Sequence, residues 1–331
     1  MRAVRYERYG EPSTVLSVAE VPEPMSPKPG EVRIRVTTRP IHPGDLVGVR
    51  GRHPGTADRP AQPVTPGLEG TGTVEIASSG FAVGQRVAFF MVAGSYGELI
   101  NAPADVVIAV PHGMDERVAA NMLINNVTAM LIVEEATAHG VPAVLAQTAA
   151  GSAVARLVSE HAERRGWRMV DIVRSTSGIE ALKAKGARHV VSTADDDWKD
   201  QVRAAADGTP IRAIVDPVGG QRVNDLLELA ENGGALIATG GLASDPAPVN
   251  WLHITGRAMR IQGVTIGNWA ARRTPEQRRR DLEETVALAA SRPDLFEPDQ
   301  SFDLADIVKA VRRSESSDRT GTVMLTSPIG G

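Results

Sequence analysis

The stretch with the clearest chemical meaning is a run of small and apolar residues from Val144 to Ala155. An apolar segment, residues 144–147, leads into a turn built around Gly151, and a helix opens at Ser152. Small residues let the backbone approach a pyrophosphate, and the first N–H groups of a helix attract phosphate oxygens. The pattern indicates a β-α-β unit that binds a dinucleotide. An ordinary crossover without a ligand is the alternative, because only Gly151 remains of the usual three glycines.

The end of the next strand indicates which dinucleotide would bind. A second apolar run, residues 169–173, ends on Arg174 and Ser175. An acidic residue at this point suits the ribose of NAD, whereas a guanidinium suits a 2′-phosphate. A simple surface arginine is the alternative. We therefore expect NADPH as the cofactor, and its predicted contacts in this half are Gly151, Ser152, Ala153, Val154, Arg174 and Ser175.

Composition fits a globular enzyme with two domains. The chain has 331 residues, of which 42% are hydrophobic and 23% charged, and its net charge is −4. This charge argues against nucleic acid or an anionic membrane as the main partner. No apolar run could span a membrane, and the N-terminal residues lack the apolar core of a signal peptide. The absence of cysteine excludes disulfides and Cys-ligated zinc, and we expect a cytoplasmic protein.

The pattern of apolar and polar residues changes at about residue 115. Up to about residue 115, short runs with period-two alternation at 31–36, 72–76 and 85–90 are broken by Pro and Gly, which predicts a β-barrel or sandwich. From there strand and helix patterns alternate, which predicts a parallel sheet with helices on both faces. The predicted strands are 143–147, 169–173, 189–192, 211–216, 234–239 and 258–264. The predicted helices are 152–165, 177–185, 196–206 and 220–231.

The last part of the chain is expected to return to the first domain. It contains a predicted helix over 274–291, a second over 304–314 and a final strand over 320–326. The expected division is one domain from 1–117 with 267–331 and another from 118–266.

These parts, in this order, resemble the medium-chain dehydrogenase/reductase superfamily over essentially the whole chain. The motifs that carry the resemblance are Pro40–Asp45, Pro66–Gly72, Asn126–Ala129, Asp216–Gly220 and Thr239–Ala243. The resemblance implies an α/β fold, with a β-rich GroES-like barrel lobe that binds substrate and a six-stranded doubly wound Rossmann domain that binds NADPH. It also implies cofactor contacts at the nicotinamide half from Gly219, Gly240, Gly241, Leu242, Val264 and Thr265.

The resemblance is to the zinc-free branch, which includes quinone oxidoreductases and 2-enoyl thioester reductases. Zinc-dependent members use a Cys and a Gly-His-Glu turn, whereas this chain has His42 and Leu68-Glu69. We therefore expect no metal, and Glu69 is interpreted as a carboxylate that packs in its turn.

The implied reaction is hydride transfer from NADPH to the activated C=C bond of an enoyl thioester or enone. An NADPH:quinone oxidoreductase and a non-catalytic cofactor-binding protein are the alternatives. The catalytic candidates are His53, His42 and Thr128, where His53 replaces a proposed Tyr proton donor and His42 replaces an Asn. A histidine pKa near ~6.5 suits general acid catalysis. An idle loop histidine, a turn histidine and a helix-interior threonine are the respective structural alternatives.

The expected partners are a small-molecule substrate and a second copy of the chain. Basic side chains at Arg50, Arg52, Arg272 and Arg273 are candidates for a CoA or carrier-protein thioester, although charged runs usually face solvent. The resemblance implies a homodimer that pairs edge strands through residues 260–266.

Overall fold

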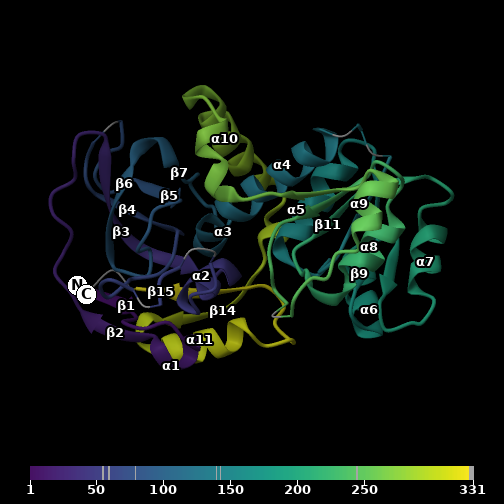
Figure 1. Cartoon of the computed structure of the whole chain (residues 1–331). Coiled ribbons are helices and arrows are strands. Elements are labelled where there is room, and N and C mark those ends of the chain that lie inside the picture. Colours follow the sequence, from purple (N-terminus) through teal and green to yellow (C-terminus); the bar gives the residue numbers. More distant parts are fainter. Residues whose placement is uncertain are drawn as a thin grey trace. The chain divides into compact units, whose positions relative to one another are not determined.

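The chain folds into two units, each built around its own sheet. The computed structural model describes residues 1–53, 56–58, 60–78, 80–138, 140–141, 143–243 and 245–327. Unit 1 comprises Met1–Ile124 with Ala270–Gly331, and unit 2 comprises Asn125–Trp269 (Figure 1). The boundary falls just inside helix α4 (Leu123–Ala138). The substrate-binding and NADPH-binding roles of the two units stay predictions.

Unit 2 is a six-stranded sheet in which every pair of neighbouring strands is parallel. The strand order is β10-β9-β8-β11-β12-β13, which is the doubly wound order of dinucleotide-binding domains. The strands are β8 (Val144–Gln147), β9 (Arg168–Val173), β10 (Val190–Ser192), β11 (Ile211–Asp216), β12 (Ala235–Ala238) and β13 (Arg260–Gly263). The predicted fold class is confirmed, because the apolar runs are the strands that helices cover on both faces.

The helices of unit 2 follow the predicted order with some shorter ends. They are α5 (Ala153–Glu163), α6 (Thr176–Ala184), α7 (Trp198–Ala205), α8 (Val223–Leu229) and α9 (Trp251–Arg257). The predicted helix over 220–231 was too long at its start, because Gly219 and Gly220 have positive φ angles of 70° and 72°. A short 3₁₀ turn, Gly220–Arg222, takes the place of the first helical turn. Helix α9 was not predicted.

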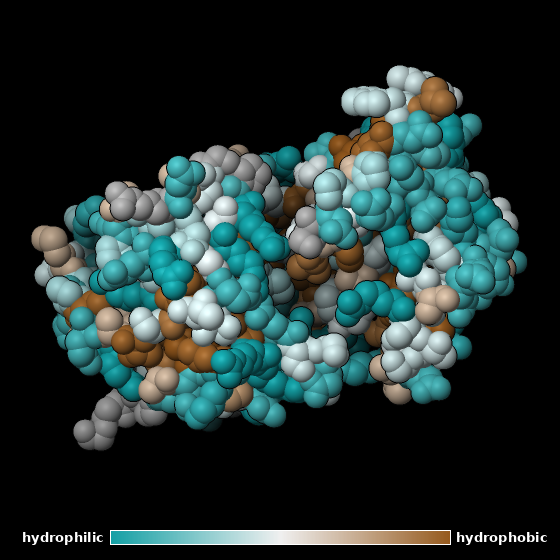
Figure 2. All heavy atoms as spheres, turned by 60° about the horizontal axis from the view of Figure 1, so that its bottom comes forward, coloured by the Kyte–Doolittle hydropathy of each residue, from teal (hydrophilic) through white to brown (hydrophobic). Residues whose placement is uncertain are grey.

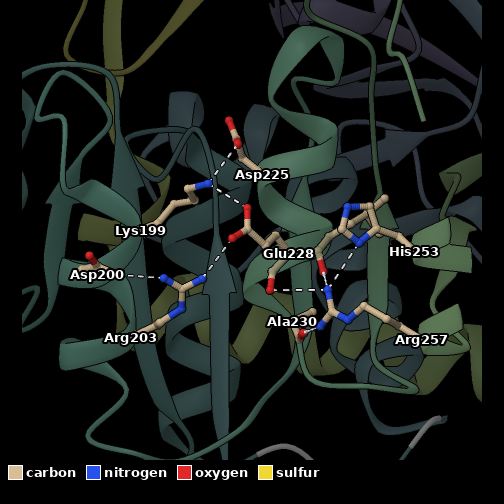
Figure 3. A network of polar contacts seen from close by, with 9 residues as sticks. Lys199, Asp200, Arg203, Asp225, Glu228, Ala230, His253 and Arg257 are labelled. Atoms are coloured by element: carbon tan, nitrogen blue, oxygen red, sulfur yellow. Dashed lines mark hydrogen bonds and ion pairs between the residues drawn. The ribbon is translucent and has the colours of Figure 1, made fainter. Parts of the chain in front are cut away.

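A polar network joins helices α7, α8 and α9 (Figure 3). Lys199 of α7 lies 2.7 Å from a carboxylate oxygen of Glu228 on α8. Arg257, at the end of α9, donates to the carbonyls of Leu227, at 2.9 Å, and of Ala230. The guanidinium therefore satisfies carbonyl groups that the end of α8 leaves without helical partners.

Unit 1 contains a seven-stranded sheet with the order β14-β15-β3-β4-β5-β7, in which β6 also pairs with β3. Its strands are β3 (Glu31–Pro40), β4 (Glu69–Ile76), β5 (Arg86–Phe90), β6 (Leu99–Pro103), β7 (Val107–Ala109), β14 (Pro298–Asp303) and β15 (Thr322–Thr326). Strands β1 (Arg2–Arg5) and β2 (Ser17–Glu20) form a separate hairpin-like pair. The helices are α1 (Pro12–Val15), α2 (Pro43–Val49), α3 (Glu116–Asn121), α10 (Pro275–Ser291) and α11 (Ile307–Ser314).

Strand β15, from the C-terminal part of the sequence, lies between β14 and β3 in the sheet of unit 1. Strand β15 pairs with β3, and a fully buried arginine on β3, Arg39, donates to Ser327 Oγ at 2.7 Å. Arg39 also donates to the carbonyls of Ser95 and Gly97. Burial lowers the pKa of Arg39 to about 9, yet the guanidinium keeps hydrogen-bond partners at Val36, at residues 95–97 and at Ser327. The return of the tail therefore uses polar contacts as well as strand pairing.

Hydrophilic side chains cover most of the face shown in Figure 2, and hydrophobic ones gather in separate patches. Among the described residues, none of the helices is long and apolar enough to span a membrane.

Candidate functional site

A buried histidine–glutamate pair forms the centre of the candidate site in unit 1. His42 caps the start of α2, and its Nε2 lies 2.6 Å from Glu69 Oε2 at the start of β4. Both side chains are nearly or fully shielded from solvent, with exposed fractions of 9% and 0%. Burial favours the neutral imidazole, but the hydrogen bond and charge of Glu69 outweigh it and raise the pKa of His42. The pair can therefore hold a proton in a site with little water.

Glu69 also fixes the start of the long helix α4. Its Oε1 accepts hydrogen bonds from the backbone N–H groups of Leu123, at 2.6 Å, and Ile124, at 2.9 Å. A carboxylate at a helix N-terminus is stabilised by these unpaired donors and by the helix dipole. From the sequence, Glu69 was expected only to pack in its turn. Its Gly-x-Glu-Gly motif was a signal, but the 27-residue separation from His42 gave no local hint of their contact.

Asp45 and Tyr96 support the turn that carries His42. Asp45 Oδ2 accepts from the His42 backbone N–H at 3.1 Å and from the Tyr96 hydroxyl at 3.0 Å. Burial raises the pKa of Asp45 above its usual range. Burial also raises the pKa of Tyr96 well above its usual value, so this hydroxyl stays a donor. The backbone of His42 is thus fixed separately from its ring.

The other two catalytic candidates, His53 and Thr128, form no hydrogen bond with the His42–Glu69 pair among the described residues. His53 is exposed in the segment after α2, and its carbonyl accepts a hydrogen bond from Thr56. In the described part of the chain, no hydrogen bond joins His53 to His42 or Glu69. Thr128 lies half-buried on α4 in unit 2. The structure therefore pairs His42 with a residue that was not predicted, and the catalytic roles of His53 and Thr128 stay predictions.

The basic residues considered for a thioester are partly committed to other contacts. Arg50 pairs with Glu11, at 2.5 Å, and with Glu315. Arg273 pairs with Asp281 at 2.9 Å, and both side chains are mostly buried. Of the four candidates, these two therefore already have structural partners.

In unit 2, the turn after β8 leads through Gly151 and Ser152 into helix α5. Ser152 caps α5, and its Oγ accepts from the Ala155 N–H at 3.2 Å. Gly151 is exposed, and a Cβ added there would meet no atom within 4 Å. Ala149 takes a left-handed conformation with φ of 47°, which is unusual for a residue with a side chain. The turn is therefore open at Gly151, while Ser152, Ala153 and Val154 are half-buried.

Arg174 and Ser175 follow directly on β9, at the same carboxyl edge of the sheet. Arg174 is exposed, and within the described residues it makes no ion pair. Ser175 caps α6 by accepting from the Gly178 N–H at 3.4 Å. The guanidinium is therefore available to pair with an anion, and its role in cofactor binding stays a prediction.

Asp216 ties together the turns at the next strand ends. It accepts from the Thr148 hydroxyl at 2.5 Å and from the backbone N–H groups of Val218 and Gly219, at 3.1 and 2.9 Å. Gly240 lies so close to this turn that an added Cβ would come within 2.9 Å of the Pro217 carbonyl. A glycine is needed there because the two turns are in backbone contact.

The remaining predicted cofactor residues lie along the same edge. Leu242 is 51% exposed, and its backbone N–H donates to the Pro217 carbonyl, while Gly241 has open space around it. Val264 follows β13, and its N–H donates to the Ala238 carbonyl. Thr265 accepts from the Gly267 N–H. The ends of β8, β9, β11, β12 and β13 thus bring every predicted cofactor residue to one edge of one sheet.

The sequence has no cysteine, and in the described ranges no three His, Cys, Asp or Glu side chains come together in a way that could hold a metal ion. His42 and Glu69 contact each other, and Asp45 is bound to the turn backbone and to Tyr96.

Comparison with known proteins identifies both units. Residues 28–112 match the alcohol dehydrogenase GroES-like domain family, and residues 153–289 match the zinc-binding dehydrogenase family. A mitochondrial enoyl-[acyl-carrier-protein] reductase of Caenorhabditis elegans is 27% identical over 278 residues, which covers 81% of this chain and 79% of that protein. A quinone oxidoreductase of Pseudomonas aeruginosa is 26% identical over 330 residues, covering 98% and 99%.

A solved structure of a candidate NADPH:quinone reductase from Bacillus thuringiensis is 27% identical and covers 98% of both chains with a TM-score of 0.87. The Escherichia coli quinone oxidoreductase complexed with NADPH has the same fold, with a TM-score of 0.86 at 19% identity over 99% of this chain and 100% of that one. Two domain families in the expected order and relatives that span nearly the full length lead to one conclusion. The chain belongs to the medium-chain dehydrogenase/reductase superfamily.

Proposed function

We propose that the protein is an NADPH-dependent reductase that adds a hydride to an activated C=C bond without a metal ion. The observation that carries this proposal is Arg174, an exposed cation at the end of β9 beside an open turn and the start of α5. A sheet edge of this kind fits a dinucleotide with an extra phosphate. The enoyl reductase and quinone oxidoreductase relatives support the same chemistry.

NADPH would supply the hydride from its nicotinamide ring when bound. The turn residues Gly151–Val154 would bind the pyrophosphate, and Arg174 with Ser175 would bind the adenosine phosphate. The strand ends at Gly219, Gly240–Leu242 and Val264–Thr265 would hold the nicotinamide half. The protein has to position these groups and to meet the negative charge that develops on the substrate carbonyl.

His42 is proposed to stabilise that carbonyl oxygen by its charge, because its Nε2 is already engaged with Glu69. Glu69 raises the pKa of His42 and restrains the ring through its Nε2. A positively charged imidazole in a dry site stabilises a developing oxyanion more strongly than it would in water. His53 is the proposed source of the proton that the α-carbon then needs, and its exposed position gives it exchange with solvent.

The test is the rate of NADPH oxidation, with NADH in parallel, against a short enoyl-CoA, a simple enone and a quinone. We expect NADPH-specific turnover of the enoyl-CoA or the enone. Turnover of the quinone alone would instead support the second candidate, a quinone reductase, which the full-length Pseudomonas aeruginosa relative favours. Tight NADPH binding without any turnover would favour a non-catalytic protein, and a preference for NADH would contradict the role of Arg174.

We also propose that two copies pair through β13. This strand is the last of the sheet, and three of its four residues are exposed. Ile261 on the strand is 43% exposed, and Trp251 and Leu252 on the neighbouring α9 are 72% and 71% exposed. An open edge beside exposed apolar side chains is a site for strand pairing between chains.

A further inference from the structure

A second arginine of unit 2, Arg222, contacts the backbone segment that pairs with the residue before Arg174. Arg222 ends the 3₁₀ turn after β11 and lies 48 residues after Arg174 in the chain. In the sheet, β11 is two strands away from β9. Its Nη2 donates to the Thr193 carbonyl at 3.4 Å. The backbone N–H of Thr193 in turn donates to the Val173 carbonyl at 2.9 Å, and Arg174 is the next residue after Val173. Two hydrogen bonds therefore connect the guanidinium of Arg222 to the base of Arg174.

An aromatic ring keeps Arg222 in this position. The guanidinium carbon lies 5.7 Å from the ring centroid of Trp198, which is itself buried at the start of α7. A cation placed over an indole face is stabilised and loses little of its hydrogen-bonding capacity. One weak bond to a carbonyl uses one donor out of five, so the remaining donors are available to a ligand.

The acidic residues nearby do not neutralise Arg222. The carboxylates of Asp195 and Asp197 accept hydrogen bonds from Gln201, at 3.3 and 2.8 Å, in the first turn of α7. Within the described ranges Arg222 forms no ion pair, and its side chain is exposed. Arg174 is likewise exposed and forms no ion pair with the described residues. Two guanidinium groups without ion-pair partners, linked through the Thr193 backbone, give this part of the sheet edge a positive charge that attracts an anion.

We infer that Arg222 and Arg174 together bind the adenosine 2′-phosphate, and that Arg222 is a specificity-determining residue for NADPH over NADH. This inference rests on the proposed function. A phosphate monoester carries close to two negative charges at neutral pH and three acceptor oxygens, which matches two forked cations. Arg174 was expected from its position in the sequence, whereas Arg222 comes to this point only because its turn packs against α7.

The experiment measures binding by calorimetry of 2′,5′-ADP, 5′-AMP, NADPH and NADH to the full chain and to Arg222→Ala. We expect Arg222→Ala to weaken 2′,5′-ADP and NADPH by about ten- to a hundred-fold, as the loss of a charge-assisted hydrogen bond does. Affinity for 5′-AMP and NADH should not change. Arg222→Lys should recover only part of the loss, because it restores the charge without the fork.

Arg203→Ala is the matched control. Arg203 lies on α7, the helix that begins with Trp198, and its partners are Asp200 and Glu228. This variant should leave all four affinities unchanged. An equal loss of NADPH and NADH affinity in Arg222→Ala would overturn the inference, because it would mean that Arg222 contacts the adenine ring or supports the fold. No loss for either would also overturn it. If the unaltered protein bound 2′,5′-ADP no better than 5′-AMP, the NADPH assignment itself would fail. This result is seen without any substitution, so it is distinguishable from the two outcomes for Arg222→Ala.

Discussion

Glu69 controls the charge on His42. Burial alone would lower the pKa of His42, and the charge and hydrogen bond of Glu69 reverse that effect. In Glu69→Gln the burial effect remains while the charge is gone, so the pKa of His42 should fall below its usual value of about 6.5. The decline of the reductase rate with rising pH should then begin at a lower pH. Because the pKa of His42 is raised in the folded state, protonation of His42 contributes its full stabilisation at low pH. This contribution is lost as the pH rises through the folded-state pKa of His42.

An NMR titration of the His42 ring measures this effect directly. Glu75→Gln is the control, because Glu75 lies on the same strand, β4, but pairs with Arg35 at a half-exposed position. An unchanged His42 titration in Glu69→Gln would show that the pair does not set the proton affinity of the ring.

Asp171 has a destabilising charge in the core of unit 2. It lies on β9, accepts from Gln147 at 2.7 Å, and burial raises its pKa to about 6. The folded state therefore holds the proton more tightly than the unfolded state, and stability should fall as the pH rises from about 4 to about 6. The difference of about 2 pKa units corresponds to about 3 kcal/mol. Asp171→Asn should remove this fall in urea unfolding at pH 4.5 and 7.5. The exposed Asp196→Asn should leave it in place, and a fall that persisted in Asp171→Asn would assign it to another group.

At the scale of elements, the turn between β8 and α5 is strained at one residue. Ala149 has a φ of 47°, a conformation that costs a residue with a side chain about 1–2 kcal/mol. Glycine has no such cost, but it gains entropy in the unfolded chain, so Ala149→Gly should stabilise the protein by up to about 1 kcal/mol. Ala153→Gly, in the first turn of α5, should instead destabilise by up to about 1 kcal/mol. Urea unfolding of both variants checks the signs, and a loss of stability in Ala149→Gly would contradict the strain.

Arg257 ties α9 to the end of α8 (Figure 3). Its removal leaves the carbonyls of Leu227 and Ala230 without a donor, so Arg257→Ala should destabilise unit 2 by about 1–3 kcal/mol. Lys199→Ala removes surface ion pairs to Asp225 and Glu228 and should cost at most about 1 kcal/mol. The two unfolding free energies should therefore differ, although both variants delete one cation of the same network. Equal losses would mean that the carbonyl contacts of Arg257 contribute no more than an exposed pair.

At the scale of the whole molecule, the unpaired edge at β13 sets the expected assembly. Light scattering should give twice the chain mass of 35.1 kDa. Ile261→Glu places a charge in the proposed pairing edge and should give the mass of one chain. Val83→Glu replaces an exposed hydrophobic residue of unit 1, 66% exposed, and should not change the assembly. A dimer that persists in Ile261→Glu would place the contact on another surface.

The sequence predicted the parallel sheet of unit 2 well and the polar contacts poorly. Strand β11 was predicted over 211–216, where it lies, because buried strands leave continuous apolar runs. Strand β14, with the residues PDQSFD, has no such run and exists because it pairs with β15. The edge that collects the predicted cofactor residues follows from strand order alone. The contacts of Glu69 with His42 and of Arg222 with Thr193 depend on packing between distant segments, which no local pattern encodes.

The place of β15 in its sheet has a consequence for synthesis on the ribosome. Unit 2 is one continuous segment, Asn125–Trp269, so all of its strands have emerged before translation reaches β15. The neighbour that pairs with the Thr38–Pro40 end of β3 is made about 280 residues after it. At about 5–20 residues per second, the nascent chain holds that edge of β3 open for roughly 15 to 60 seconds. During this interval we expect the unpaired edge of β3 to be open to aggregation with other chains.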